Sequence, residues 1–543
     1  MSALLCCATV TAQERAKDSP RIVNIINFIR ELEPRDKRIT EDVLRNTVER
    51  QIDQLNEHKL PATFLLQYDA LIDLRYKKLF DEKLGKDSEI GAWWEITQPH
   101  VEAAGMKWRG RFPWDWHADV GFATGYTPAE REKLVDVYMA KFKDTFGYYP
   151  KSVGSWFIDA HTLGYMHKKY GIVASCNCKD QYGTDGYTLW GGYWNQAYYP
   201  SRKNAFMPAQ NAAAQIPVPI FRMLGSDPIY QYDDSLGASR QGVISLEPVY
   251  PRAGGDVKWV EWFFRSIFEE PSLTFNYAQV GQENSFTWGA MEKGLNIQIP
   301  RLAKLAREGK IRVETLETSG GWFKKNFLVT PPSAVTALSD PRDEGNKTVW
   351  FNSRFYRANL LWQKDGFRFH DMHLFDERME SDYLTKAGTS NQCVYRTLPV
   401  MDGYLWSERN ERSGLYLLRE KSSGGWEEIV LRDPEVTEPT STTLRIRCQA
   451  NAEEIFTITF LEDRFEVQRE GGSGKWVLAS KVPAAKQGDA AMFGKISGNQ
   501  IKGSFNGINY KLVCTQGTPM KQAGALFAIA PKANKIAVDC SRR

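Results

Sequence analysis

Short apolar runs alternate with longer amphipathic stretches over most of the first 330 residues, and this order limits the fold more than any other feature. Residues 21–29 (RIVNIINFI) read as a buried strand. The next stretch starts at Thr40, a residue typical of helix N-caps, and repeats apolar residues at 43, 44, 48, 52 and 55. Residues 62–66 (ATFLL) follow as a second strand. Alternation of this kind is typical of βαβ units and predicts a parallel sheet.

The same order continues further along the chain. The predicted strands are 90–94, 152–158, 172–176, 273–280 and 311–315, and the predicted helices are 128–146, 162–170 and 288–308. About seven strand–helix repeats emerge, and they are least distinct between residues 200 and 271. We therefore predict an α/β chain whose residues 21–330 form a (β/α)7-type parallel barrel and catalytic domain.

The pattern changes after residue 327. Short alternating runs at 413–418, 443–448, 455–460 and 465–469 are separated by Gly, Asn and Asp. Such runs predict an antiparallel β-sandwich over residues 331–543. This domain either binds glycan through its tryptophans or braces the barrel by lending a loop to the cleft.

Residues 1–20 are predicted to be a signal peptide and an N-terminal tail. The opening MSALLCCATVTAQ is a short apolar run that closes on Val-Thr-Ala, which suits signal-peptidase cleavage after Ala12. No run reaches the roughly 18 apolar residues that a membrane span needs. We therefore expect a soluble, secreted or periplasmic protein without a membrane span.

Charge and aromatic content narrow the class of partner. The formal net charge of the 543 residues is +4, with no long basic block, so we expect no nucleic-acid partner. The chain holds 17 Trp and 23 Tyr, many in Gly-rich or polar stretches such as 187–199. Flat rings in such places suit stacking against sugars, although they are equally compatible with loop packing. A carbohydrate is therefore the expected substrate.

Nearly every predicted strand of the barrel is followed by a carboxylate. Parallel barrels carry their reactive groups at the carboxyl ends of the strands, because the βα loops converge there. A solvated loop acid is the simpler explanation for any one of these residues. A series of them on one rim is nevertheless what a glycosidase needs, since it uses two carboxyls across the scissile bond.

Asp159 and Glu283 are the predicted catalytic pair, with Glu95 as a further candidate. Asp159 follows the run 152–158 and precedes a helix, so it is predicted as nucleophile or base, or alternatively as a helix N-cap. Glu283 lies between two amides and is predicted as the acid, or alternatively as a buried ion-pair partner. The predicted substrate-binding residues are Trp94, Gln67, Asp69, His161, Asp180, Trp190, Trp194, Gln282 and Asn284.

Histidines in the catalytic half raise the question of a metal. His100, His117 and His161 lie near aspartates in the sequence, and an Asp with two His could hold a hydrolytic zinc ion. No two histidines in this half have the i, i+4 spacing that makes such a motif specific. We therefore predict no cofactor, and keep these three histidines as the candidate zinc ligands of a metal-dependent enzyme.

Residues 21–325 resemble the seven-stranded barrels of NodB-type polysaccharide deacetylases and of glycoside hydrolase families 38 and 57. The resemblance rests on the first strand, on ERQIDQLNEHKLPATFLL and on WFIDAHTLGYMHKKYGI. Trp156-Phe157-Ile158-Asp159 resembles the W-x-I-D segment of family 38 α-mannosidases, whose aspartate is the nucleophile and contacts zinc. This implies the same role for Asp159. The whole chain is similar to Bacteroidetes glycoside hydrolases that carry uncharacterised domains.

The chain departs from these families at the metal-binding positions. The mannosidases carry H-x-D after the first strand, where this chain has Asn27 to Glu31, and the deacetylases carry H-x-x-x-H after the third, where His100 stands alone. Both departures favour metal-free chemistry of the family 57 kind. The leading hypothesis is an exported glycoside hydrolase. The alternatives are a metal-dependent carbohydrate deacetylase and a non-catalytic glycan-binding protein.

Overall fold

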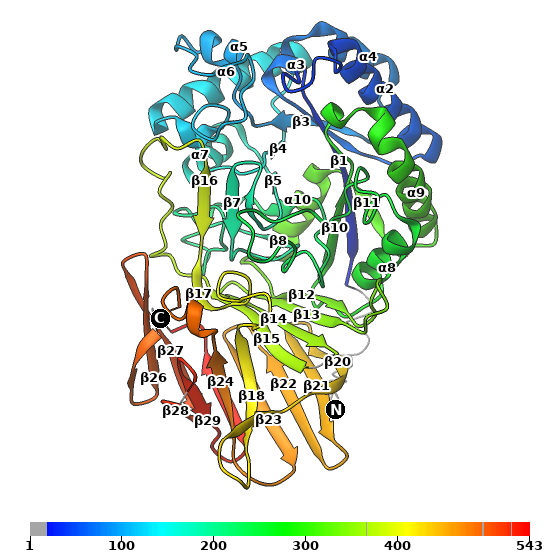
Figure 1. Ribbon diagram of the computed structural model, residues 1–543. Helices are drawn as coiled ribbons and strands as arrows, with labels where there is room; N and C mark the ends of the chain where they lie inside the picture. The colour runs from blue at the N-terminus through cyan, green and yellow to red at the C-terminus, as the bar shows by residue number, and fades with distance from the viewer. Residues whose placement is uncertain (1–18, 365, 491–492, 523, 543) are drawn as a thin grey trace, which may run out of the picture.

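The computed structural model describes residues 19–364, 366–490, 493–522 and 524–542. The predicted signal peptide lies outside the described residues, as does the predicted N-terminal tail apart from residues 19 and 20. Figure 1 shows helices wrapped around a central sheet in the N-terminal half, with packed sheets below them in the C-terminal half. The predicted class, a parallel α/β barrel followed by antiparallel β structure, is confirmed.

The barrel sheet has seven parallel strands in the order β10-β1-β2-β3-β4-β5-β9, and β8 continues it in antiparallel fashion. Its strands are β1 (Arg21–Ile29), β2 (Thr63–Leu66), β3 (Glu89–Trp93), β4 (Ser152–Gly154), β5 (Ala174–Asn177), β8 (Ala197–Tyr198), β9 (Ile220–Arg222), β10 (Asn276–Val280) and β11 (Arg312–Glu314). The sheet is nearly closed. Between β9 and β10, the Gln279 side chain accepts a hydrogen bond from the Leu224 backbone N–H at 2.7 Å.

Two strands differ from the sequence-based expectation in their place in the barrel. The predicted strand 311–315 is β11, and it pairs with the first half of β1 beside the barrel. The strand between β5 and β10 is instead β9, which lies in the indistinct region 200–271. Only three residues of β9 are in strand conformation, which is too few to leave a periodic signal.

Helices cover the outside of the barrel, as βαβ connections require. They are α2 (Glu41–His58), α3 (Tyr68–Ile72), α4 (Leu74–Lys83), α5 (Gln98–Ala103), α6 (Pro128–Phe146), α7 (Ala160–Tyr170), α8 (Val257–Phe268), α9 (Trp288–Arg307) and α10 (Leu316–Asn326). α6 begins with a reciprocal capping box between Thr127 and Glu130. Among the described residues, no helix is long and apolar enough to cross a membrane.

The C-terminal half consists mainly of two antiparallel sheets of ten and eight strands. The first contains β12 (Ser333–Ala337), β13 (Lys347–Asn352), β14 (Tyr356–Gln363), β15 (Gly366–Leu374), β17 (Leu398–Asp402), β18 (Gly414–Glu420), β19 (Trp426–Glu428), β24 (Trp476–Lys481), β28 (Thr518–Met520) and β29 (Ala528–Ala530). The second contains β20 (Arg432–Thr440), β21 (Thr443–Asn451), β22 (Glu454–Phe460), β23 (Arg464–Gly471), β25 (Phe493–Ser497), β26 (Gln500–Phe505), β27 (Ile508–Gln516) and β30 (Lys535–Asp539). Phe351 of the first stacks on Phe460 of the second, with centroids 5.1 Å apart, so the sheets share a core.

One strand of the C-terminal half leaves these sheets and joins the barrel half. β16 (Cys393–Arg396) pairs in parallel with β7 (Tyr187–Trp190), which also pairs with β6 (Gln181–Thr184). Figure 1 shows β16 beside β7, above the C-terminal sheets. The segment just before β16 is thereby held against the barrel loops.

Candidate functional site

A cavity of about 730 Å³ opens at the carboxyl ends of the barrel strands. Its lining comes largely from the segments that follow β1, β3, β5, β9 and β10. We call it the rim pocket, and Arg30, Trp156, Lys179, Glu247 and Glu283 are among its lining residues. Loops converge over a rigid sheet at this face, which is where parallel barrels place reactive groups. The rim pocket is therefore the candidate active site.

Arg30, the residue directly after β1, connects two buried glutamates. Its Nε and Nη2 donate to the two carboxylate oxygens of Glu95 at 2.9 and 2.6 Å. Its Nη1 lies 2.8 Å from Oε2 of Glu283. The guanidinium also lies over the Trp114 ring, 4.1 Å from the centroid. Arg30 is therefore fixed by a bidentate ion pair and a ring, with one edge directed at Glu283.

Glu95 lies beneath the pocket and acts as an anchor. Besides Arg30, it accepts hydrogen bonds from Gln67 Nε2 at 2.8 Å and from Trp156 Nε1 at 2.9 Å. Its side chain is fully buried. With four donors on its two oxygens, this carboxylate has no edge directed at a substrate. Glu95 instead positions Arg30 and Trp156, and the structure does not place this predicted catalytic candidate in the pocket lining.

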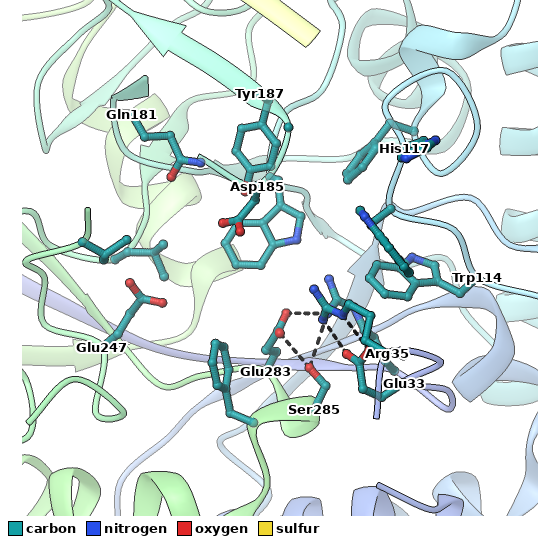
Figure 2. A pocket seen from close by; sticks show the side chains of 18 of the residues that line it. Glu33, Arg35, Trp114, His117, Gln181, Asp185, Tyr187, Glu247, Glu283 and Ser285 are labelled. Carbon is teal, nitrogen blue, oxygen red and sulfur yellow. Dashed lines mark hydrogen bonds and ion pairs between the residues drawn. The ribbon is translucent and has the colours of Figure 1, made fainter. Parts of the chain in front are cut away.

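Glu283 follows β10 and lines the pocket directly. Burial raises the pKa of its carboxyl, while the Arg30 guanidinium and the Ser285 hydroxyl oppose this rise. Ser285 Oγ donates to Oε1 at 2.6 Å. Figure 2 shows the contact between Glu283 and Ser285 as a dashed line. An adjacent guanidinium and hydroxyl donor both favour the ionised form of Glu283.

Glu247 supplies a second buried carboxyl, and in Figure 2 both groups point toward the same open space. Glu247 accepts from Ser245 Oγ at 2.6 Å and from Gln282 Nε2 at 3.0 Å. Burial raises its pKa, and the hydrogen bond from Ser245 and the charge of Lys179 only partly offset this. Because its hydrogen-bond donors are neutral, Glu247 is better suited than Glu283 to remain protonated.

Aromatic rings form part of the pocket walls. Trp114, Trp116, Phe122, Trp156, Tyr187, Tyr250 and Phe286 all contribute. Trp116 and Trp156 are partly exposed, so a ligand can reach their rings. Sugars present C–H faces that pack on such rings.

The C-terminal half also contributes to the pocket. Asn391 and Gln392 line it immediately before β16, and both are exposed. The Ala118 N–H donates to the Asn391 carbonyl at 3.1 Å, which ties this segment to the barrel loops. The arrangement matches the expected bracing role, in which the β domain lends a loop to the cleft.

Asp159 lies elsewhere on the rim and does not line the rim pocket. Its Oδ1 accepts from Thr162 N and from Arg131 Nη1, both at 2.9 Å, and its Oδ2 accepts from Thr162 Oγ1 at 2.6 Å. This is the N-cap geometry that the sequence left open as the alternative. The predicted strand 152–158 ends at Gly154, so Asp159 belongs to the start of α7 rather than to a strand end.

Three of the predicted substrate-binding residues lie around the pocket as supports. Gln282 bonds to Glu247, and Gln67 bonds to Glu95. Asn284 pairs with the backbone of Arg30, accepting from its N–H at 2.9 Å and donating to its carbonyl at 2.8 Å. These amides hold the charged groups in place, and none of the three belongs to the pocket lining.

The other predicted substrate-binding residues lie away from the pocket. Trp94, Trp190 and Trp194, the expected sugar platforms, are at most 2% exposed, and Trp194 stacks on Trp350 with centroids 3.8 Å apart. Asp69 accepts a hydrogen bond from Thr97. Asp180 forms ion pairs with Arg222 and Arg357, and His161 lies beside Glu132. Their aromatic or acidic character was visible in the sequence, but their tertiary partners were not.

The three candidate zinc ligands do not converge. His100 is enclosed by aromatic rings, its Nε2–H donates to the Leu134 carbonyl oxygen at 2.8 Å, and burial lowers its pKa to about 4. His161 is on the surface beside Glu132, and only His117 lines the pocket. Within the described ranges, no three His, Cys, Asp or Glu residues are grouped so as to hold a metal ion. These three histidines do not fit a zinc centre.

Sequence reasoning missed Glu247. It lies 25 residues beyond the end of β9, within a long irregular stretch, so the rule of reading residues directly after strands does not reach it. The Ser-Leu-Glu sequence around it carries no motif. Arg30 directly follows β1, but no sequence signal pairs it with Glu95 and Glu283.

The comparisons with known proteins agree with the fold. A family model described as a domain of unknown function with a solved structure (DUF3863) matches residues 118–296, about a third of the chain. A search of curated proteins found no match. A solved structure from Parabacteroides distasonis, described as a glycoside hydrolase/deacetylase, shares 16% identity and a TM-score of 0.51, covering 70% of this chain and 90% of its own.

Two further solved structures match with lower TM-scores. A polysaccharide deacetylase from Mycobacterium smegmatis has 11% identity and a TM-score of 0.33, covering 56% of this chain and 91% of its own. A family 4 acetyl xylan esterase from Clostridium thermocellum, in complex with a cobalt ion, has 12% identity and a TM-score of 0.25, covering 57% and 94%. The likeness to the Parabacteroides distasonis structure, at 16% identity, concerns the fold alone.

Proposed function

We propose that this chain is a carbohydrate hydrolase that cleaves glycosidic bonds in the rim pocket, with Glu247 and Glu283 as its pair of carboxyls. The observation that carries the proposal is that two buried carboxyls face one cavity in different surroundings. Glu283 is paired with a guanidinium, whereas the hydrogen-bond donors of Glu247 are neutral. Glycoside hydrolysis needs such a difference, because one carboxyl must give a proton while the other stays ionised.

Glu247 has the role of proton donor in this proposal. Burial raises its pKa and so favours the protonated form, which a donor to the glycosidic oxygen needs as the bond breaks. Gln282 and Ser245 fix its orientation through hydrogen bonds to separate oxygens. Both donors remain suited to the carboxylate that is left after proton transfer.

Glu283 has the role of the ionised partner. Arg30 and Ser285 hold its carboxylate in place, and Glu95 keeps Arg30 from moving. Glu283 then either activates a water molecule or attacks the anomeric carbon. The configuration of the first product separates these routes, because direct attack by water inverts it and a covalent intermediate retains it.

Features of the pocket support a carbohydrate as the substrate. Partly exposed Trp116 and Trp156 offer stacking faces, and Asn391 and Gln392 offer amides to sugar hydroxyls. The fold neighbour from Parabacteroides distasonis is described as a glycoside hydrolase/deacetylase, and the proposal adopts the first of these activities. We also propose that the protein is exported, because residues 1–13 resemble a signal peptide.

A panel of plant and host glycans and aryl glycosides tests the proposal when reducing ends and acetate are measured in the same reactions. We expect reducing ends from the wild type, and a loss of about a thousandfold in Glu283→Gln and in Glu247→Gln. Release of acetate without reducing ends would replace the proposal with a deacetylase. Binding without either product would replace it with a glycan-binding protein.

A further inference from the structure

Lys179 is a buried cation in the wall of the rim pocket. It follows β5, its residue is 1% exposed, and it belongs to the pocket lining. Within the described part of the chain, its Nζ has no hydrogen-bond partner. An ammonium group carries three donors, and leaving them unused in a buried position costs free energy.

The neighbouring carboxylates are already committed to other donors. The Asp180 carboxylate accepts hydrogen bonds from Arg222 Nη2 at 2.7 Å, from Arg357 Nη1 at 2.5 Å and from the Gly191 N–H at 3.0 Å. Glu247 interacts with the charge of Lys179 but takes its hydrogen bonds from Ser245 and Gln282. The charge on Lys179 therefore lacks a dedicated counter-ion that binds it directly.

We propose that Lys179 recognises an anionic substituent of the substrate, so that the preferred glycan carries uronate carboxylates or sulfate esters. This inference rests on the proposed function, because it assigns a substrate class to the same pocket. A carboxylate or sulfate oxygen would accept the hydrogen bonds that the protein leaves unmade. Charge-assisted bonds of this type are stronger than those to a neutral hydroxyl.

A second cation stands at the same pocket. Arg240 is exposed, lines the pocket, and lies next to Gly183, where an added Cβ would come 3.4 Å from the Cβ of Arg240. Among the residues that the structure describes, no ion pair involves Arg240. It is therefore placed to attract an anionic ligand toward Lys179.

Asp185 is one of the opposing charges at the pocket, and its exposure limits its effect. The lining acids Glu33, Asp36 and Glu283 are each paired with an arginine. The Asp185 carboxylate also faces the cavity in Figure 2, but the residue is solvent-exposed. Water and salt screen an exposed charge far more than a buried one. Near Lys179, the buried ammonium group therefore affects the binding of a charged ligand more than the exposed Asp185 carboxylate does.

Binding of monosaccharides tests this inference without any requirement for hydrolysis. Pairs such as galacturonate with galactose, glucuronate with glucose, and glucose 6-sulfate with glucose are titrated by ligand-detected NMR. We expect the wild type to bind at least one anionic member about tenfold or more tightly than its neutral partner. The carboxylate and sulfate pairs distinguish the two sources of the charge.

Lys179→Met keeps most of the side-chain volume and removes the charge. We expect it to abolish the preference for the anionic sugar and to leave the melting temperature unchanged or higher, because a buried unpaired charge is lost. Lys502→Met, on an exposed position of β26, is the matched control and should keep the preference.

The outcomes separate this inference from the proposed function. Equal binding of charged and neutral sugars by the wild type overturns the inference, as does a preference that survives in Lys179→Met. An anionic preference without hydrolysis of any glycan supports the inference and removes the proposed glycosidase. Hydrolysis of neutral glycans with no preference for anionic sugars supports the proposed glycosidase and overturns the inference about Lys179.

Discussion

Among the buried arginine–carboxylate pairs on the rim of the barrel, Arg30–Glu283 borders the rim pocket and Arg131–Asp159 does not. Arg30 meets Glu283 at 2.8 Å, and Arg131 meets Asp159 at 2.9 Å. In each pair a neighbouring hydroxyl donates to the carboxylate at 2.6 Å, from Ser285 in the first and from Thr162 in the second. The local chemistry of the two pairs is therefore closely matched.

The surroundings of the two pairs differ. Arg131 also donates to the carbonyls of Tyr383 and Lys386 from the C-terminal half, and its side chain is fully buried. Glu283 instead borders the rim pocket. The sealed pair ties the two halves together, whereas the open pair has space for a substrate. A buried acid at a strand end is thus a candidate for chemistry only when a cavity reaches it.

Substitution of the sealed pair should have the largest effect on stability. Asp159→Ala leaves Arg131 buried without its carboxylate and removes the N-cap of α7, so we expect a loss of about 3–5 kcal/mol in the free energy of unfolding. Glu283→Gln should cost only about 1 kcal/mol, because Arg30 keeps its bidentate contact with Glu95. Chemical denaturation measures the free energy of unfolding of both variants. Equal losses in the two variants would contradict the difference between the sealed and the open pair.

Asp69 is a further buried carboxyl, and it accepts a hydrogen bond from the Thr97 hydroxyl at 2.5 Å. Burial raises its pKa to about 7, so between about pH 4 and 7 the folded state binds more protons than the unfolded state. Stability contributed by Asp69 should therefore fall as pH rises through this window, by at most about 1.4 kcal/mol per pH unit. Asp69→Asn should flatten this part of the profile of unfolding free energy against pH. An unchanged slope in the variant would contradict the assignment.

The two matched hydroxyls offer a finer test. Ser285→Ala removes a donor that stabilises ionised Glu283, so its pKa should rise and the acidic limb of the pH–rate profile should move up by about one pH unit. Thr162→Val removes the equivalent donor at Asp159 and should leave that limb in place. A shift in the Thr162 variant alone would assign the titrating group to the sealed pair.

Chelation should have the smallest effect. Because His100, His117 and His161 are separated in the structure, we expect hydrolysis to survive overnight treatment with EDTA and dialysis with less than about a twofold change. Loss of activity that is restored by zinc would show that a metal site forms from other residues.

Much of the fold could be predicted because periodicity reports on local structure. The predicted strand 21–29 and helix 128–146 match β1 and α6, since a buried run and a capping box are local signals. β9 was not resolved, because three residues in a long irregular stretch carry no period. The return of β16 to β7 joins segments about 200 residues apart, which no local pattern records.

The site was only partly predictable for the same reason. Glu283 could be found because it directly follows β10, and the rule that barrels react at strand ends applies to it. Asp159 satisfied the same rule in sequence, yet it is committed to Arg131 and Thr162, and only the tertiary structure reveals these partners. Glu247 comes to the pocket through a loop, whose course the sequence does not specify.

The most direct test of the account is the turnover of Glu283→Gln beside that of Asp159→Asn, both measured on the best substrate of the wild type. Each change removes one buried carboxylate from an arginine with little change in shape. The account predicts a fall of about a thousandfold in kcat for Glu283→Gln. For Asp159→Asn it predicts a lower melting temperature and a kcat per folded molecule within about threefold of the wild type. The reverse pattern, with Asp159→Asn inactive while folded and Glu283→Gln active, would contradict it.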